Sequence, residues 1–166
     1  MKRSGCTRIY FGIESGDDQV LKLMNKHITR LQASAAVEAA HQAGLEVGAF
    51  FILFYPGETD ETVLNTLHFT TSLPLDYLGL TLPYPLPGTA LYNRVSERIT
   101  RQWHPGESLF TTHRLIFKSD FSETKMLFGL LKGQVQFRIK NKLGKLAPLA
   151  LRLFEKPSDW VFKHLR

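Results

Sequence analysis

The stretch from Gly48 to Thr59, GAFFILFYPGET, decides the fold of this chain. Its first half is an apolar run too short for a buried helix, which is typical of a parallel strand covered on both faces. Pro56 and Gly57 then predict a tight turn, and Thr59 stands at a helix N-cap position. The stretch is either simply a well-formed βα turn or, because ligands bind at this edge of α/β folds, part of a binding site.

The same unit recurs on both sides of this stretch. The predicted strands cover residues 7–13, 45–54 and 76–82, and the predicted helices cover residues 19–25, 29–43, 60–72 and 90–97. Thr29 with Gln32 predicts a capping box, and Gly44 predicts a helix end. Strands that alternate with helices indicate a parallel sheet with right-handed crossover connections. Three strands are few for such a sheet, so we expect other residues to complete it.

The pattern weakens after residue 98. Residues 103–106 predict a turn, and residues 109–110 and 115–117 predict short strands. Ser122 begins a long predicted helix that ends near Leu143, and we expect Gly129 and Gly133 to interrupt it. A second apolar helix is predicted over residues 149–154, and a last one near Trp160.

Composition excludes several classes of protein. The 166 residues, 43% hydrophobic and 22% charged, suit one soluble globular domain. No apolar run approaches the ~20 residues of a membrane-spanning helix, and the N-terminus lacks a signal-peptide pattern. Cys6 is the only cysteine, so an internal disulfide is impossible and the cytoplasm is the expected compartment. One thiolate is also too few to hold an iron–sulfur cluster.

The basic charge lies at the C-terminal end. Residues 130–166 carry nine Lys and Arg against two Asp and Glu, so the rest of the chain is close to neutral. Leu, Phe and Trp alternate with these cations at roughly helical spacing. The segment has three possible roles: weak contact with an anionic membrane surface, a cover for the open edge of the sheet, or a solvated basic face on packed helices. No nucleic-acid partner is expected.

Three predicted loops follow the carboxyl ends of the three strands, at residues 14–16, 55–59 and 83–85. In a parallel barrel or sheet such loops converge on one pocket. They offer carboxylates, hydroxyls and aromatic surface, a set that fits a polar small molecule with a sugar and a flat ring. Glu14 is a candidate binding residue, or else a helix cap or the partner of an Arg, whereas for Glu58 we favour a structural role. The six histidines have no metal-ligand spacing.

Three groups of motifs follow one another at the spacing of one βα unit each: GIESG at 12–16 with LKLMNK at 21–26, FIL at 51–53 with PGET at 56–59, and PYPLPGTALY at 83–92. With Thr29, they resemble the radical S-adenosylmethionine (radical SAM) enzymes, and most closely the branch that often carries an N-terminal cobalamin-binding domain. The resemblance covers about Gly5 to Val95. It implies an α/β fold, a partial (β/α) TIM-like barrel, of which this chain supplies about three parallel strands with crossover helices.

The resemblance also implies a cofactor and its contacts. In the family, a Cys-x-x-x-Cys-x-x-Cys loop holds a 4Fe-4S cluster that reduces S-adenosylmethionine and generates a 5′-deoxyadenosyl radical. Glu14 and Ser15 match the residues that contact the ribose hydroxyls. The strand with Ile52 and Phe54 matches the one that lies along the adenine and methionine parts. The backbone of the last strand, which often meets the adenine edge in the family, corresponds to Leu82, Pro83 and Tyr84.

Departures from the family pattern limit what this chain is expected to do. The cysteine motif is missing, and so is the glycine-glycine-glutamate region that binds the methionine amino group. Phe54 stands where the family usually has Gly, and is expected to crowd the cofactor or to shift the strand. We therefore predict the C-terminal half of a radical SAM barrel at residues 1–97 and a mostly helical, basic extension at residues 98–166.

Two functions follow as alternatives. The chain is the C-terminal part of a radical SAM enzyme with an unknown substrate, either as an encoded fragment or as one piece of a split protein whose N-terminal half is separately encoded. Alternatively, it is a non-catalytic interaction module, as a split-protein partner or a decayed fragment. By itself it is expected to hold no cluster and to bind S-adenosylmethionine weakly. The strands at 8–13 and 76–82 would expose edges, which predicts self-association unless the C-terminal helices cover the opening.

Overall fold

The structure, a computed structural model, describes residues 2–100 and 115–165 of the chain. Its strands are β1 (Arg8–Glu14), β2 (Glu46–Ile52) and β3 (Tyr77–Thr81). Its α-helices are α1 (Asp18–Leu23), α2 (Arg30–Gln42), α3 (Asp60–Ser72), α4 (Ala90–Val95), α5 (Glu123–Leu143) and α6 (Ala147–His164). Short 3-10 helices are η1 (Lys2–Ser4), η2 (Ser96–Arg98) and η3 (Gly144–Leu146). The alternation of strands and helices up to α4 is the predicted one.

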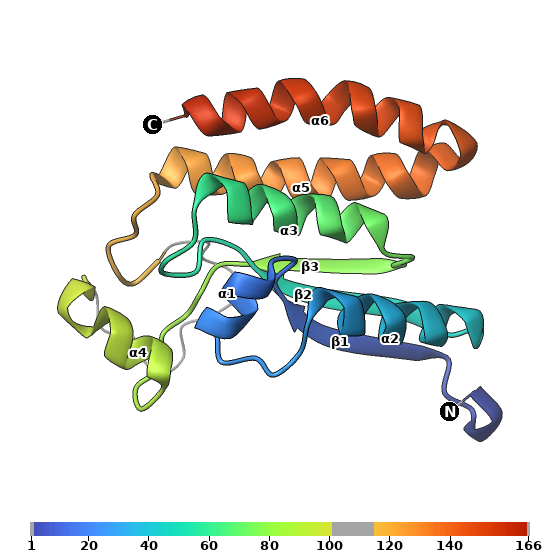
Figure 1. Cartoon of the computed structure of the whole chain (residues 1–166), viewed down its shortest axis with the longest axis horizontal. Helices are drawn as coiled ribbons and strands as arrows, with labels where there is room; N and C mark the ends of the chain where they lie inside the picture. The colour runs from blue at the N-terminus through green and yellow to red at the C-terminus, as the bar shows by residue number, and fades with distance from the viewer. Residues whose placement is uncertain (1, 101–114, 166) are drawn as a thin grey trace.

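The three strands form one parallel sheet in the order β1-β2-β3 (Figure 1). Arg8 of β1 lies opposite Glu46 of β2, and Gly48 of β2 lies opposite Tyr77 of β3. Each strand is joined to the next through at least one helix, which confirms the predicted crossovers. Because β2 is central, β1 and β3 are both edge strands in the described part of the chain, and the sheet there is open.

Helices cover one face of this sheet (Figure 1). α2 packs against β1 and β2, and α5 packs against β3 and α3. α6 packs on α5 and α3 and forms a second layer, farther from the sheet (Figure 1). One hydrophobic core, with Val37, Val47 and Phe51, lies between the sheet and its helices. A second core, with Leu67 and Phe162, joins α3, α5 and α6.

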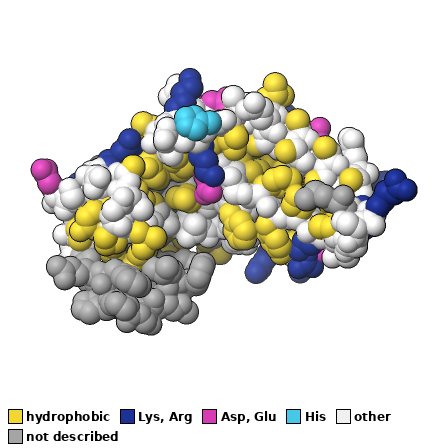
Figure 2. All heavy atoms as spheres, turned by 90° about the horizontal axis from the view of Figure 1, so that it is seen from below, with side chains coloured by type: hydrophobic (Ala, Val, Ile, Leu, Met, Phe, Trp, Pro, Cys, Tyr) yellow, Lys and Arg dark blue, Asp and Glu magenta, His cyan; other side chains and the backbone are white. Residues whose placement is uncertain are grey.

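Within the described residues, the other face of the sheet is open, which corrects the prediction that the central strand is covered on both faces. Phe50, in the middle of β2, is 48% exposed, and Tyr10 and Tyr77 beside it are exposed as well. Hydrophobic side chains gather across the middle of the surface that Figure 2 shows from below. A doubly buried strand and a strand that lines an incomplete barrel carry the same apolar residues, so the run alone did not separate them.

Local capping sets the helix starts at the predicted places. The Thr29 and Thr59 side chains each accept a hydrogen bond from the backbone N–H three residues on, within capping boxes at the starts of α2 and α3. Ser122 caps α5 in the same way. Gly44 follows α2 with φ 76°, a left-handed conformation that ends the helix as predicted.

α5 is one uninterrupted helix of 21 residues, which corrects the predicted interruption at its glycines. Both glycines lie where neighbouring side chains come close. A Cβ on Gly129 would lie 2.6 Å from Cζ of Phe54, and a Cβ on Gly133 would lie 2.5 Å from Cδ1 of Leu80. These glycines therefore allow α5 to approach the sheet and its loops closely.

α6 is also one helix, where two shorter ones were predicted. Pro157 lies inside it, although Pro removes a backbone donor and often ends or kinks a helix. The Ser158 hydroxyl bonds to the Phe154 carbonyl at 2.7 Å, and Phe162, one turn later, is fully buried in the second core. Before Pro157, Glu155 accepts a hydrogen bond from Gln136 of α5, so contacts on both sides of the proline hold the two predicted pieces in one helix.

α6 does not cover the open face of the sheet, so that predicted arrangement is wrong. It packs on the helical side, which agrees with the alternative of basic helices packed against the barrel. The predicted turn at residues 103–106 and the short strand at 109–110 lie outside the described residues. In the third predicted segment, Phe117 forms a single antiparallel bridge with Ile99, not a strand.

Candidate functional site

Aromatic rings lying over glycines form the floor of the open face. A Cβ on Gly48 would lie 2.3 Å from the ring of Tyr10, and a Cβ on Gly79 would lie 2.4 Å from the ring of Phe50. The two rings stack with their centroids 5.5 Å apart. The glycines are therefore required for a flat apolar surface, which spans all three strands.

Arg8, Glu46 and Tyr77 join the three strands at the amino end of this floor. Arg8 Nη2 lies 2.6 Å from Glu46 Oε2 and donates to the Tyr77 hydroxyl at 2.6 Å. The hydroxyl in turn donates to Glu46 Oε2 at 3.2 Å. The hydrogen bond from Arg8 holds the pKa of Glu46 below its usual range. This end of the face is thus occupied by paired charges, and it holds the Tyr77 ring in place.

Glu14 lies at the opposite, carboxyl end of the same face. The pairing of β1 with β2 shifts between Gly12 and Glu14, and Glu14 has φ 73°. A Cβ on Gly12 would lie 2.8 Å from Glu14 Oε1, so the carboxylate lies over Gly12 on the open side. Lys26 Nζ lies 3.3 Å from the same oxygen. The predicted pairing with a cation is present, with Lys in place of Arg.

Ser15 does not face the open side. It is fully buried, and its hydroxyl lies 3.0 Å from Thr66 Oγ1 of α3. The same hydroxyl accepts a hydrogen bond from Asp17 N at 3.1 Å. Ser15 therefore ties the loop after β1 to α3, and its assignment to a ribose stays a prediction from the resemblance.

Ile52 and Phe54 lie on opposite sides of the chain at the end of β2. Ile52 is half-buried opposite Thr81 of β3, on the side of the sheet that Gly48 and Phe50 share. Phe54 has φ 66° and is buried in the second core. The expected crowding of the open face does not occur, because this positive φ turns the Phe54 ring toward the helices.

The residues after β3 run along the carboxyl edge. Leu82 packs against the second core and is half-buried. Pro83 is buried and Tyr84 is half-buried. Leu53 N donates to Thr81 O at 2.9 Å, so the ends of β2 and β3 stay adjacent up to this loop. The parallel order thus brings the loops after all three strands to one edge, as predicted.

Glu58 has a structural role, as favoured, but it closes a turn, and Thr59 is the residue that caps α3. The Glu58 carboxylate is buried and Oε2 accepts a hydrogen bond from Tyr55 N at 2.7 Å, which closes the Tyr55–Thr59 turn. Oε1 has no hydrogen-bond partner within the described part of the chain. Burial raises the pKa of Glu58 to about 7.

A groove lies beside this edge, lined by α1 and the start of α3. It is a polar groove of about 340 Å³ whose lining includes Asp17, Gln19, Thr59, Glu61, Thr62 and Asn65. Asn65 Nδ2 donates to Asp17 Oδ2 at 3.0 Å, which joins its two walls. The groove is lined by helices and loops, and so it is separate from the aromatic floor.

Sequence reasoning missed the aromatic floor and Lys26. The sequence does carry a pattern for the floor. An aromatic residue and a glycine are two positions apart in each of two strands, which places both on one strand face: Tyr10 and Gly12 in β1, and Gly48 and Phe50 in β2. Lys26 carried no such signal. It reaches Glu14 and the Gly12 carbonyl from beyond α1, a contact that depends on the fold.

The residues present fit S-adenosylmethionine in part and do not fit an iron–sulfur cluster. An acceptor at Glu14 beside a flat apolar surface suits a ribose next to a purine. Cys6, in contrast, is the only cysteine of the sequence, and its Sγ donates to Arg8 O at 3.3 Å, at the amino end of β1. Among residues 2–100 and 115–165, no cluster of His, Cys, Asp and Glu is arranged to hold a metal ion.

Comparison with known proteins gives one family. Residues 1–70 match the model of the radical SAM superfamily. The chain is 33% identical over 147 residues to an uncharacterised methyltransferase of Pyrococcus horikoshii, covering 86% of this chain and 31% of the relative. It is 26% identical over 161 residues to the bacteriochlorophyllide d C-12(1)-methyltransferase of Chlorobaculum tepidum, covering 96% of this chain and 34% of that protein.

A solved structure shares the fold. Archaeal Elp3 of Methanocaldococcus infernus, with an N-terminal deletion, superposes with a TM-score of 0.52 at 20% identity, over 57% of this chain and 23% of that one. The chain spans about a third of the length of the two methyltransferases. No helix in the described ranges has the length and apolar character that crossing a membrane requires. The matched model, the relatives and the shared partial barrel agree with the order of the sequence motifs, and the chain belongs to the radical SAM superfamily.

Proposed function

We propose that this chain forms the C-terminal part of the catalytic domain of a radical SAM enzyme, and that its open face contributes to the S-adenosylmethionine pocket. One observation carries the proposal: the Glu14 carboxylate lies over Gly12, at the carboxyl edge of an uncovered aromatic sheet face. A hydrogen-bond acceptor beside a flat apolar surface is what a ribose joined to a purine requires. Residues 1–97 would supply this part, and residues 98–166 the extension.

Residues of this chain have distinct parts in the proposed pocket. Glu14 would accept hydrogen bonds from the ribose hydroxyls, with Lys26 keeping its carboxylate in place. Ile52 would pack along the apolar parts of the ligand, and the backbone of Leu82, Pro83 and Tyr84 would meet the purine edge. Phe54 would take part through its backbone, because its ring lies in the second core.

S-adenosylmethionine supplies the family's deoxyadenosyl group when it is bound beside a 4Fe-4S cluster. We propose that the thiolates for that cluster come from outside this chain, in the part of the enzyme that corresponds to the remaining length of the relatives. Methyl transfer is the reaction class we propose, because the two relatives named above are called methyltransferases. The resemblance to the cobalamin-linked branch supports the same choice.

Mapping of amide chemical shifts by nuclear magnetic resonance tests the pocket in this chain. S-adenosylmethionine is titrated to millimolar concentration into the isotope-labelled chain. We expect weak binding, because much of the pocket is contributed from elsewhere. The shifted amides should gather at residues 14–15, 52–54 and 82–84.

Two carboxylates on the same face give a matched comparison. Glu14→Gln should remove most of the shifts, whereas Glu46→Gln, at the amino end beside Arg8, should leave them in place. Shifts centred on the α1–α3 groove, or no shifts at the highest ligand concentration, would contradict the proposal. Micromolar affinity that disappears in Glu14→Gln would show that the pocket is more complete than we propose.

A second candidate function is a non-catalytic interaction module. It rests on the edges of β1 and β3 and the floor between them, which no other described segment pairs with or covers. Such surfaces pair readily with another polypeptide. The same titration separates the two functions. An interaction module would show no ligand shifts at the carboxyl edge.

A further inference from the structure

The outer side of α6 presents an apolar stripe. It consists of Leu146, just before α6, and of Leu149, Leu153 and Trp160 within it. Their spacing of three, four and seven residues places them on one side of the helix. All four are between 61% and 69% exposed. Packing against α5 and α3 uses the opposite side, where Phe162 is buried. The stripe is therefore left uncovered by the rest of the described chain.

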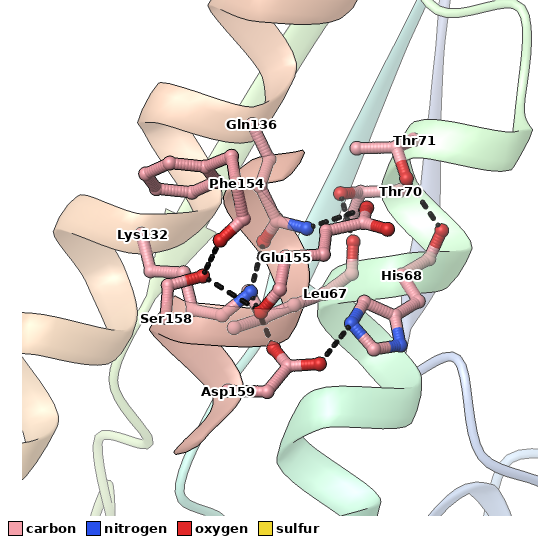
Figure 3. Close-up of polar contacts among 10 residues, drawn as sticks. All are labelled: Leu67, His68, Thr70, Thr71, Lys132, Gln136, Phe154, Glu155, Ser158 and Asp159. Atoms are coloured by element: carbon pink, nitrogen blue, oxygen red, sulfur yellow. Dashed lines mark hydrogen bonds and ion pairs between the residues drawn. The ribbon is translucent and has the colours of Figure 1, made fainter. Parts of the chain in front are cut away.

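The acidic residues of α6 are turned away from this stripe. Gln136 Nε2 of α5 donates to Glu155 Oε1 at 2.8 Å. Asp159 lies between Lys132 Nζ of α5, at 2.8 Å, and His68 Nε2 of α3, at 3.0 Å (Figure 3). Both carboxylates of α6 thus belong to the interface of three helices, where Asp159 pairs with the buried Lys132 and Glu155 accepts from Gln136. α6 contributes no carboxylate to its outer side.

A row of cations borders the stripe. Lys145, just before α6, and Arg152, Lys156 and Lys163 within it are exposed, and they follow one another at seven, four and seven residues. That spacing places them along one flank of the leucines. An apolar stripe with a basic border and a Trp is the composition of helices that lie in the surface of a bilayer. The leucines would enter the acyl boundary while the cations meet lipid phosphates.

We propose that the outer face of α6 binds the surface of an anionic lipid bilayer, with the helix parallel to it. A second copy of this chain is a poorer occupant, because it would set one row of cations against another. Nucleic acid would use the cations but leave the exposed leucines in water. The inference is independent of the S-adenosylmethionine pocket, which lies on the other side of the sheet from α6.

Vesicle flotation tests this with the full chain. The bound fraction should be roughly tenfold higher on vesicles of phosphatidylglycerol and phosphatidylcholine in equal parts than on phosphatidylcholine alone, and should fall at high salt. Leu149→Ser combined with Leu153→Ser should abolish the binding, and so should the triple change Arg152→Gln, Lys156→Gln and Lys163→Gln. In a Trp103→Phe background, the Trp160 emission should shift to the blue on the anionic vesicles.

Matched variants separate this face from general charge and hydrophobicity. Leu31→Ser removes an exposed leucine from α2, and Arg3→Gln with Lys22→Gln and Lys118→Gln removes the same charge elsewhere. Both should bind like the unchanged chain. Equal binding to both kinds of vesicle, binding to neither, or an equal loss in the control triple would overturn the proposal. So would binding that survives both serines and is displaced by a single-stranded polynucleotide.

Discussion

At the residue scale, the carboxyl edge of the sheet depends on two backbone conformations that residues with side chains rarely adopt. Glu14 and Phe54, at the ends of the first two strands, have φ of 73° and 66°. Such conformations cost on the order of 1 kcal/mol each and persist where the surroundings impose them. The reversal sends the Glu14 carboxylate onto the open face and the Phe54 ring into the second core, 5.0 Å from the ring of Phe121. The same left-handed backbone conformation thus positions a candidate binding group, the Glu14 carboxylate, and a packing group, the Phe54 ring.

Glu58 makes the stability of this edge depend on pH. Burial raises its pKa to about 7 from 4.5. Between these values the folded chain holds a proton that the unfolded chain has lost, so this contribution to stability is complete below the lower pKa and is lost as the pH rises through the higher one. Glu58→Gln stays neutral. The unfolding free energy of the original chain, relative to this variant, should therefore fall by about 2–3 kcal/mol between about pH 5 and 8.

Urea unfolding at several pH values measures this difference. Glu61→Gln, an exposed change one turn away, is the control and should give a curve parallel to that of the original chain. A parallel curve for Glu58→Gln as well would show that the Glu58 carboxyl titrates alike in the folded and unfolded chain.

At the element scale, α5 joins the sheet to the outer helix layer, and its glycines set how close the layers come. Lys132 lies between Gly129 and Gly133 in sequence and is buried against α6, where Asp159 pairs with it. Burial lowers the pKa of Lys132. The helix therefore has one face that admits no side chain and another that carries a buried ion pair.

Gly129→Ala tests the close approach. In an exposed helix Ala is more stable than Gly by about 1 kcal/mol. Here the added methyl would meet the rings of Phe54 and Phe162 at 2.6 and 3.2 Å, so we expect a net loss of roughly 1–3 kcal/mol. The urea midpoint measures it, with Arg138→Ala at an exposed site of the same helix as a control that should stay within about 0.5 kcal/mol. A raised midpoint for Gly129→Ala would refute the packing argument.

Helix starts were predictable because capping is local: the side chains of Thr29 and Thr59 act on N–H groups within the first turn. The open face of β2 could not be predicted from the sequence, because whether a strand face is covered depends on elements far along the chain. Ser15 shows the same limit within the candidate site. Its partner Thr66 lies 51 residues away, and no neighbouring residue indicates that the hydroxyl turns inward. The prediction of two helices where α6 runs as one failed for the converse reason, since contacts with α5 hold the helix together across Pro157.

At the scale of the whole molecule, helices cover one face of a sheet whose two edges are unpaired among residues 2–100 and 115–165. We expect the purified chain to self-associate through the aromatic floor and these edges. Light scattering over a range of concentrations measures this. Phe50→Ser should reduce the association, whereas Leu31→Ser, on the helical side, should not. A monodisperse monomer at all concentrations would show that this face does not bind another copy.

Truncation after Gly144 is expected to make the chain aggregate, for a reason other than the one expected from sequence. α6 does not shield the open face, but its loss would expose the second core around Phe54 and leave Lys132 without Asp159. The apolar surface that the second core would then present to solvent promotes association. Equal solubility of the truncated and full chains would contradict this role for α6.

The rings and glycines of the open face also select how the strands align along their length. Parallel strands have no hairpin turn to fix their register. A shift of one residue in the pairing of two strands would place the apolar side chains of one strand on the wrong face of the sheet. A shift of two residues would place the Tyr10 and Phe50 rings opposite residues that carry side chains. The observed alignment gives each ring a glycine, Gly48 for Tyr10 and Gly79 for Phe50. In descendants of this sequence, a side chain gained at either glycine would therefore require a smaller residue in place of its ring.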